Sequence, residues 1–268
     1  MTSTVPIPGT AGQPHVHIEI TGGVFVCAPN SVNLMTSYVL LEQEDWFEDE
    51  IKFVRRMLKP GMQVVDIGAS YGVYSLTAAR CVGATGRVWA FEPSSATAAC
   101  LARGIERNRF DNLHLIQAGL SNRSGQAKLM ISPNTELGFV AEEGAADGAH
   151  EIVLLKTVDN CMTEWGWKDI DFMKIDAEGH EEKIIVGGAR FFDSNSPLIL
   201  YEIKAGDKIN LELADAFATL GYRSYRLIPG LNVLVPFIKG EQLDPYQLNL
   251  FCCKPDRADV LSRQGMLI

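Results

Sequence analysis

The chain has 268 residues, of which 47% are hydrophobic, so it can form one sizeable core but hardly two full-sized domains. Its formal net charge of -9 argues against a protein held by its overall field to nucleic acid or to an anionic membrane surface. We therefore expect neither of these as a partner, and a small molecule or a carbohydrate fits the charge better. An oligomer is compatible with these numbers.

The N-terminus MTSTVPIPGTAGQP lacks the basic start and the apolar centre of a secretory signal. No later apolar run approaches the roughly 18 residues that a membrane span requires. The cysteines include no CxxC pair, and a chain of this length needs no disulfide framework. These features predict a cytoplasmic protein with reduced thiols.

Composition divides the chain into four segments. Residues 1–14 are rich in Thr, Pro and Gly, which indicates a flexible tail. Residues 15–58 predict an N-terminal extension, with a hairpin centred on Gly22-Gly23 and then a helix. The main domain covers residues 59–256, and we expect residues 257–268 to be a C-terminal tail.

Strand and helix signals alternate through the main domain. The apolar strands MQVVDIGA, RVWAFEP, LHLIQAGL, IDFMKID and LILYEI are separated by helical segments, one of them over residues 181–192. Such connections imply right-handed crossovers and a parallel sheet that is buried on both faces. The last two strands, RSYRLI and LNLFCC, are close enough in sequence to form an antiparallel edge. The fold class is therefore α/β, with helices on both faces of a mostly parallel sheet.

The alternation breaks after the third strand. AKLMIS and IVLLKTV are strand-like, but residues 133–150 between them consist largely of Gly, Ala and acidic residues with little to pack. We interpret residues 133–150 as a mobile loop or lid. Further along, Asp159 is predicted to be the N-cap of a short helix over residues 160–165.

The first chemical motif, DIGASYG, follows the first parallel strand. In doubly wound sheets, ligands bind at the carboxyl ends of the strands, where the strand order reverses. The two glycines would let the backbone approach a ligand closely, and the aspartate supplies a hydrogen-bond acceptor at the floor of the crevice. We therefore assign these residues, with one serine beyond them, to cofactor binding: Asp66, Gly68, Ala69, Ser70, Tyr71, Gly72 and Ser75.

The ends of the next two strands complete a nucleoside site. The second strand ends in Phe91-Glu92-Pro93, and the Glu92 carboxylate is the right type of group to accept both hydroxyl protons of a ribose. At the third strand end, the small residues Ala118 and Gly119 would leave room for an adenine ring.

The glycine spacing separates two candidate cofactors. A dinucleotide requires G-x-G-x-x-G, and the run Gly-Ala-Ser-Tyr-Gly lacks the second glycine of that pattern. S-adenosylmethionine carries no phosphate and has a sulfonium and an amino-acid tail, so a leading aspartate and a looser glycine loop suit it better. The alternatives are a nucleotide-dependent oxidoreductase and a non-catalytic subunit that only binds S-adenosylmethionine.

These residues resemble the FkbM-type S-adenosylmethionine-dependent methyltransferases. The resemblance covers residues 60–228 and rests, in order, on DIGASYGVYS, AFEP, LKTVD, KIDAEGHE and LILYEI. It implies a Rossmann-like class I methyltransferase fold with a seven-stranded, mostly parallel sheet whose last strand is antiparallel. It also implies methyl transfer to a hydroxyl oxygen, typically of a saccharide or a secondary metabolite. The residues themselves do not name the acceptor.

The stretch KIDAEGHE places acidic residues at the end of the fourth parallel strand. Asp176 ends this strand, Glu178 lies in the following turn, and Glu202 ends the fifth strand, so we expect the three to converge. We assign Asp176 to the methionine end of the cofactor, and Glu178 and Glu202 to the acceptor hydroxyl or its proton. His180 is a second candidate base, whereas we expect Glu181 to serve the following helix.

A divalent metal is possible but not favoured. Asp176, Glu178 and Glu202 offer the hard oxygen ligands that magnesium or calcium takes. Their spacing follows no established metal motif, so we assign no residue as a metal ligand.

Overall fold

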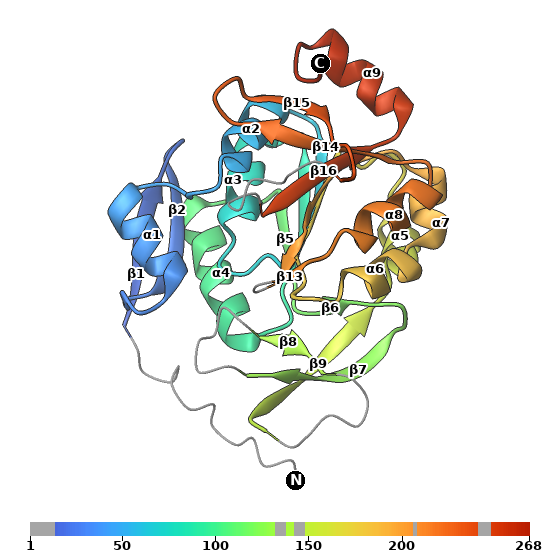
Figure 1. Cartoon of the computed structure of the whole chain (residues 1–268). Helices are drawn as coiled ribbons and strands as arrows, with labels where there is room; N and C mark the ends of the chain where they lie inside the picture. The colour runs from blue at the N-terminus through green and yellow to red at the C-terminus, as the bar shows by residue number, and fades with distance from the viewer. Residues whose placement is uncertain (1–13, 132–137, 142–147, 206–207, 241–247) are drawn as a thin grey trace.

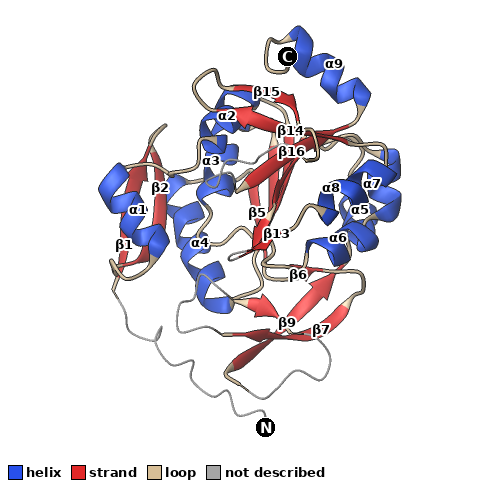
Figure 2. Cartoon of the chain, viewed as in Figure 1, coloured by secondary structure: helices blue, strands red, loops and turns tan. Residues whose placement is uncertain are grey.

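The computed structural model describes residues 14–131, 138–141, 148–205, 208–240 and 248–268 (Figure 1). A central sheet is flanked by helices on both faces, with a hairpin on one side and a smaller sheet at one end (Figure 2). The flexible tail predicted for residues 1–14 lies outside the described residues, apart from Pro14.

The central sheet has eight strands in the order β15-β14-β16-β11-β10-β3-β4-β5. In that order they are Val233–Pro236, Arg223–Ile228, Asn249–Cys253, Leu198–Glu202, Phe172–Ile175, Gln63–Ile67, Arg87–Phe91 and Leu113–Ile116. The five strands from β11 to β5 are parallel, and β16 is antiparallel to β11. The strand order reverses between β3 and β10, as the doubly wound pattern requires.

The prediction of a mostly parallel sheet with an antiparallel edge is therefore correct, but the predicted number of seven strands is wrong. The additional strand, β15, pairs antiparallel with β14 at the edge of the sheet. Its sequence, VLVP, is short and ends in a proline, so it does not alternate clearly enough to predict a strand.

Helices cover both faces of the sheet because strand residues alternate between two hydrophobic cores. Val64 and Phe172 belong to the core under α2 (Glu50–Met57), α3 (Val73–Val82) and α4 (Ser95–Asn108). Val65 and Met173 belong to the opposite core. Its helices are α5 (Val158–Trp165), α6 (Glu181–Gly187), α7 (Ala189–Ser194) and α8 (Glu212–Thr219).

The N-terminal extension contains the predicted hairpin and helix α2, together with a helix that was not predicted. Strands β1 (His15–Ile20) and β2 (Val24–Pro29) pair antiparallel around Gly22-Gly23. The additional helix is α1 (Met35–Gln43), and it contacts both strands of the hairpin. The sequence pattern of α1 does not predict an amphipathic helix, because the helix buries the polar residues Thr36 and Ser37 and exposes the apolar residues Met35 and Tyr38.

A second sheet in the order β6-β9-β7-β8 follows the third parallel strand. Its strands are Gly119–Leu120, His150–Lys156, Gly125–Met130 and Phe139–Val140. The last of these, β8, lies within residues 133–150 and pairs antiparallel with β7, so this part of the predicted loop or lid is a strand. Residues 133–137 and 142–147 of that prediction lie outside the described residues. A separate pair, β12 (Lys204–Ala205) and β13 (Lys208–Ile209), follows β11.

The prediction of a C-terminal tail over residues 257–268 is wrong. Residues Pro255–Arg263 form α9, which begins with proline at a position that needs no backbone donor. Leu261 and Met266 are buried in the core under α2, and Leu267 forms a bridge with Leu234 of β15. This segment has too few apolar residues for a helical periodicity to be recognised in the sequence. Among the described residues, no helix is long and apolar enough to cross a membrane.

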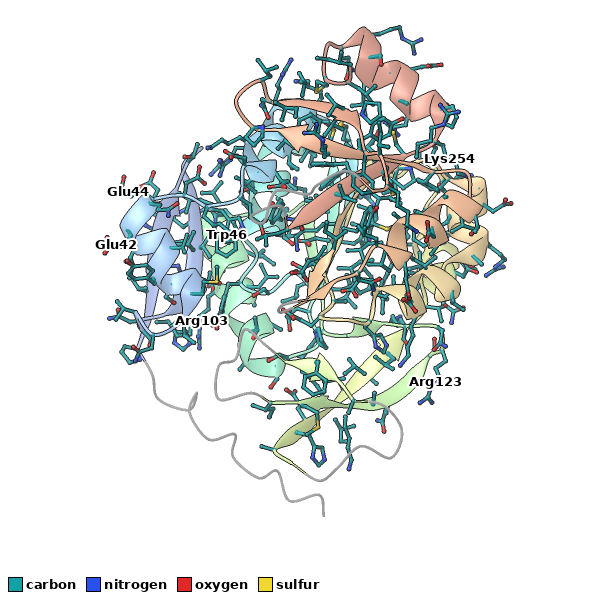
Figure 3. All side chains as sticks on the ribbon, in the orientation of Figure 1. Glu42, Glu44, Trp46, Arg103, Arg123 and Lys254 are labelled. Carbon is teal, nitrogen blue, oxygen red and sulfur yellow. The ribbon has the colours of Figure 1, made fainter. Side chains whose placement is uncertain are left out.

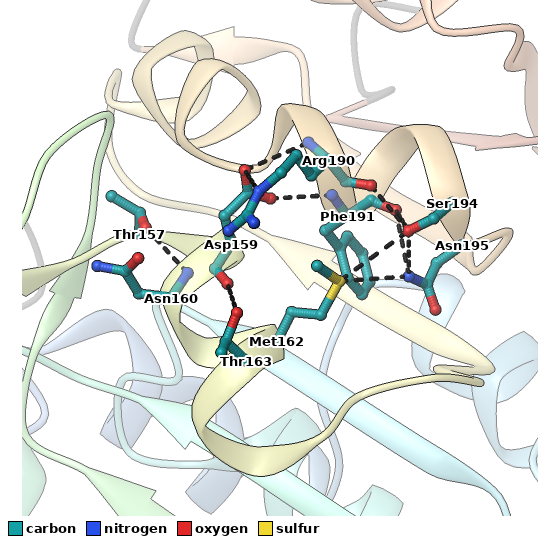
Figure 4. Close-up of polar contacts among 9 residues, drawn as sticks. All are labelled: Thr157, Asp159, Asn160, Met162, Thr163, Arg190, Phe191, Ser194 and Asn195. Atoms are coloured by element: carbon teal, nitrogen blue, oxygen red, sulfur yellow. Dashed lines mark hydrogen bonds and ion pairs between the residues drawn. The ribbon is translucent and has the colours of Figure 1, made fainter.

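The helices α5 and α7 are joined by Asp159 (Figure 4). The N-cap of α5 is Thr157, whose hydroxyl accepts a hydrogen bond from the Asn160 N–H at 3.1 Å, so the prediction that Asp159 is the N-cap is wrong. The Asp159 carboxylate instead accepts from the backbone N–H groups of Arg190 at 3.3 Å and Phe191 at 2.9 Å. The helix predicted over 181–192 is divided at Gly188, and Asp159 binds the start of its second part.

Replacing Asp159 with Ala should lower the free energy of unfolding by about 1–2 kcal/mol, because two backbone donors at the start of α7 lose their acceptor. Chemical denaturation measures this difference. The control is Asp193→Ala, an exposed position in the same helix, which should change stability by less than about 0.5 kcal/mol. Equal effects of the two substitutions would contradict the capping role.

Candidate functional site

A cavity of about 410 Å³ opens at the carboxyl ends of the central parallel strands. It is lined by residues at the ends of β3, β4, β10 and β11 and by residues that directly follow these strands. The predicted site residues that line the cavity are Asp66, Gly68, Ala69, Ser70, Tyr71, Glu92, Gly119, Asp176, Glu178, His180 and Glu202. Gly72, Ser75 and Ala118 do not line it, and their assignment to cofactor binding stays a prediction.

The two loop glycines are required by protein packing. Gly68 has a φ of 77°, and a Cβ atom there would lie 1.7 Å from the backbone oxygen of Asp176. Gly72 has a φ of 87°, and a Cβ atom there would lie 2.2 Å from Cδ1 of Leu101. Packing therefore explains both glycines, and their role in bringing the backbone close to a ligand stays a prediction. Gly68 lets two strand ends meet, and Gly72 lets α4 pack against the loop.

Asp66 is a buried carboxylate at the floor of the cavity. Its Oδ2 atom accepts a hydrogen bond from the Ser75 hydroxyl at 2.5 Å, which is the role that the structure gives to Ser75. Its Oδ1 atom is buried and has no hydrogen-bond partner among the residues that the structure describes. Burial raises the pKa of Asp66, and the nearby Lys174 ammonium opposes this effect. A ligand that donates a hydrogen bond to Oδ1 would satisfy an otherwise costly buried acceptor.

Glu92 is held in place by the backbone on both sides. Its two carboxylate oxygens accept hydrogen bonds from the N–H groups of Ser70 at 2.9 Å and Ser94 at 2.8 Å. Burial raises the pKa of Glu92 to about 7, although both backbone donors favour the charged form. Each oxygen keeps acceptor capacity for a ligand hydroxyl.

Lys174 is a buried cation among the carboxylates that line the cavity. Its Nζ atom donates to Oδ2 of Asp176 at 2.6 Å, and its side chain is only 7% exposed. Burial alone would lower the pKa of Lys174, but the carboxylates of Asp176 and Asp66 more than offset this effect and raise it. Because Lys174 lies inside a strand, its contribution to the site could not be recognised from the sequence pattern.

Glu178 and Glu202 converge with Asp176 on this cavity, as predicted from the strand ends. Burial, followed by the nearby Asp176 and Glu181 carboxylates, raises the pKa of Glu178 to about 7. Burial, followed by the Asp176 and Glu178 carboxylates, also raises the pKa of Glu202. At neutral pH, Glu178 is therefore able to take up or release a proton, which is the property of a general base.

The end of the KIDAEGHE stretch is mainly structural. The Oε1 atom of Glu181 accepts from the backbone N–H groups of Ala177 at 2.8 Å and Gly179 at 3.3 Å, so this carboxylate stabilises the turn before α6. His180 is buried, and its Nε2 atom lies 2.9 Å from the Ser121 hydroxyl. His180 nevertheless lines the cavity, so its predicted role as a second base remains a hypothesis.

One wall of the cavity comes from the N-terminal extension and was not predicted from the sequence. This wall consists of Met35, Thr36, Trp46, Phe47 and Glu48. The Tyr74 hydroxyl donates to Oε2 of Glu48 at 2.7 Å and so joins the extension to α3. Nothing in the local sequence of the extension indicates that it lies beside the strand ends.

The acidic residues do not form a recognisable metal centre. Among the residues that the structure describes, no group of three or more His, Cys, Asp or Glu side chains is arranged to hold a metal ion.

Residues 66–226 match the family model of the methyltransferase FkbM domain, which is well over half of the chain. The chain belongs to the FkbM methyltransferase family. This match confirms the resemblance drawn from DIGASYGVYS and KIDAEGHE, and it confirms that the protein is a methyltransferase. The N-terminal wall lies outside the matched residues and is a feature of this FkbM chain beyond the family domain.

No curated protein matches the chain. Among solved structures, methyltransferase FkbM from Methylobacillus flagellatus is 17% identical with a TM-score of 0.47, over 81% of this chain and 53% of that chain. A SAM-dependent methyltransferase from Aquifex aeolicus is 13% identical with a TM-score of 0.43, over 80% and 90% of the two chains. A SAM-dependent O-methyltransferase from Thermotoga maritima is 12% identical with a TM-score of 0.41, over 88% and 77%.

Replacing Gly68 with Ala should lower the free energy of unfolding by about 2–4 kcal/mol, because the new methyl group collides with the Asp176 backbone at an unfavourable φ. The control is Gly166→Ala, where φ is also positive but no atom lies within 4 Å of the new Cβ. This control should cost about 1 kcal/mol. Denaturant unfolding of both variants measures the difference, and equal costs would show that Gly68 is needed only for its backbone conformation.

Proposed function

We propose that this protein uses S-adenosylmethionine to methylate a hydroxyl group of a saccharide or of another small metabolite. The observation that carries the proposal is that carboxylates from four strand ends line one cavity. Asp66 and Glu92 come from β3 and β4, and Asp176, Glu178 and Glu202 come from β10 and β11. We assign the β3–β4 end to the donor, with Asp176 beside its methionine part, and the β10–β11 end to the acceptor.

The first end suits the donor. The buried Asp66 Oδ1 atom, which has no partner within the described part of the chain, can accept from an ammonium group, while Glu92 can accept from two ribose hydroxyls. The cavity volume of about 410 Å³ lies within the range of ordinary small-molecule sites. The loop Gly-Ala-Ser-Tyr-Gly lacks the second glycine that a pyrophosphate-binding loop requires. These features support S-adenosylmethionine over a dinucleotide.

The second end suits deprotonation of an alcohol. When S-adenosylmethionine is bound, the acceptor oxygen bonds to its methyl carbon while the carbon–sulfur electron pair stays on sulfur, which leaves S-adenosylhomocysteine. Glu178 accepts the hydroxyl proton, because its raised pKa allows proton uptake near neutral pH. Glu202 orients the acceptor, and Lys174 holds Asp176 in place through their 2.6 Å contact. The chain therefore contributes mainly alignment and one proton transfer.

Replacing Glu92 with Gln should weaken the binding of S-adenosylhomocysteine by about tenfold at about pH 8, above the pKa of Glu92, because charge-assisted hydrogen bonds to the ribose become neutral ones. Isothermal titration calorimetry measures the dissociation constant. The control Glu106→Gln, on the exposed side of α4, should bind as the wild type does. Tight binding of NAD in place of S-adenosylhomocysteine would overturn the proposed cofactor.

The rate of methyl transfer should rise with pH through about 7, because Glu178 must lose its proton before it can act as a base. Glu178→Gln should lower kcat by about 10²- to 10⁴-fold and abolish this dependence, while S-adenosylhomocysteine still binds. Initial rates with an alcohol acceptor over a series of pH values test both points. Glu182→Gln, at an exposed position in α6, is the control. An unchanged profile in the Glu178 variant would remove Glu178 as the base.

A further inference from the structure

Helix α1 and the residues before it expose an unusual series of apolar side chains. Val32 is 67% exposed, Met35 52%, Tyr38 51% and Leu41 41%. Successive members are three residues apart, so the last three lie along one side of α1. We refer to these four residues as the α1 apolar face.

The α1 apolar face has more neighbouring exposed apolar side chains than an ordinary protein surface. Single exposed apolar residues are normal on proteins, whereas a contiguous group indicates a binding surface. In the described part of the chain, eleven large apolar side chains are exposed, and four of them belong to the α1 apolar face. The other side of α1 buries Val39 and Leu40 near the hairpin, so the helix is already anchored. The α1 apolar face is exposed in the part of the chain that the structure describes.

The α1 apolar face is continuous with the cavity. Met35 is half exposed and also lines the cavity, and the adjacent Thr36 lines it as well. The rings of Trp46 and Phe47 line the same wall, with their centroids 4.9 Å apart. Figure 3 shows Trp46 on the segment between α1 and the central domain. An apolar surface thus runs from inside the cavity onto the outside of α1.

The wall that joins these surfaces is held firmly. Arg55 of α2 donates to both carboxylate oxygens of Asp45, at 2.7 and 2.6 Å, and both side chains are largely buried. Glu48 accepts from the Tyr74 hydroxyl. These contacts fix the residues on either side of Trp46 and Phe47, so the wall is pre-organised for a ligand.

We propose that the α1 apolar face binds the apolar part of an amphipathic acceptor whose hydroxyl-bearing end occupies the cavity. This inference rests on the proposed function, and it adds that the acceptor carries an extended hydrocarbon portion. The polar end lies beside Glu178 and Glu202, and the apolar portion leaves past Trp46 and Met35. The binding surface belongs to the N-terminal extension, outside the residues that match the family domain.

The test uses the full chain loaded with S-adenosylhomocysteine and a series of probes: methyl, butyl and octyl β-glucopyranosides below their micelle concentrations. Calorimetry should show that the octyl compound binds at least tenfold more tightly than the methyl compound, because methylene groups leave water. The double variant Tyr38→Gln, Leu41→Gln should lose this dependence and bind the methyl compound as the wild type does. Affinities that do not depend on chain length, or no binding of any glycoside, would overturn the inference.

A matched control comes from the second sheet. Ile152 and Leu154 of β9 are 55% and 54% exposed, and neither lines the cavity. The double variant Ile152→Gln, Leu154→Gln should retain the full dependence on chain length. Sedimentation of the wild type provides another criterion. Dimers that dissociate in the Tyr38, Leu41 variant would show that a second copy covers the α1 apolar face, and this would also overturn the inference.

The same probes separate this inference from the proposed function. Methyl transfer to the glycosides without any effect of chain length would leave the proposed function intact and remove the role of α1. Tight binding that depends on chain length, without transfer to any alcohol, would support the role of α1 and contradict the proposed reaction.

Discussion

The site depends on the close approach of two strand ends, at Gly68 after β3 and at Asp176 after β10. The Asp176 N–H donates to the Ile67 carbonyl oxygen at 3.0 Å, and there is no room for a side chain at position 68. Because β3 and β10 are neighbours where the strand order reverses, this contact forms the floor of the cavity. Any residue larger than glycine would displace Asp176, and with it the ion pair to Lys174.

The charges of the site follow from this convergence. Lys174 interacts with the carboxylates of both Asp66 and Asp176 and offsets part of their repulsion. Burial, together with the remaining repulsion, raises the pKa values of Glu178 and Glu202. Such shifts reduce the stability of the folded chain at neutral pH, because the unfolded carboxyl groups ionise more easily. They also bring Glu178 into the range where a carboxylate can exchange protons, and strongly shifted groups are common at active sites.

The success and failure of the sequence predictions have the same origin. Asp66, Glu92, Asp176 and Glu202 line one cavity, as their places at the strand ends predict, because parallel strands must end on one edge of the sheet. Local patterns failed where a contact came from a distant segment. The Asp159 carboxylate accepts hydrogen bonds from backbone N–H groups that lie 31 and 32 residues away in the sequence. Helix α9 packs against the core through only a few apolar side chains. Helix α1 was missed because its apolar residues do not share one face: Val39 and Leu40 are buried, whereas Met35, Tyr38 and Leu41 are exposed.

The sequence by itself determined the strand ends and their acidic residues, since alternation and crossover topology follow from local spacing. It also determined the family, through motifs that are continuous in the chain. Only the tertiary structure decided that Gly72, Ser75 and Ala118 lie outside the cavity. It also decided that residues near Trp46 form a wall and that Glu178 has a pKa of about 7. Burial and proximity depend on residues far apart in sequence, and no local pattern encodes them.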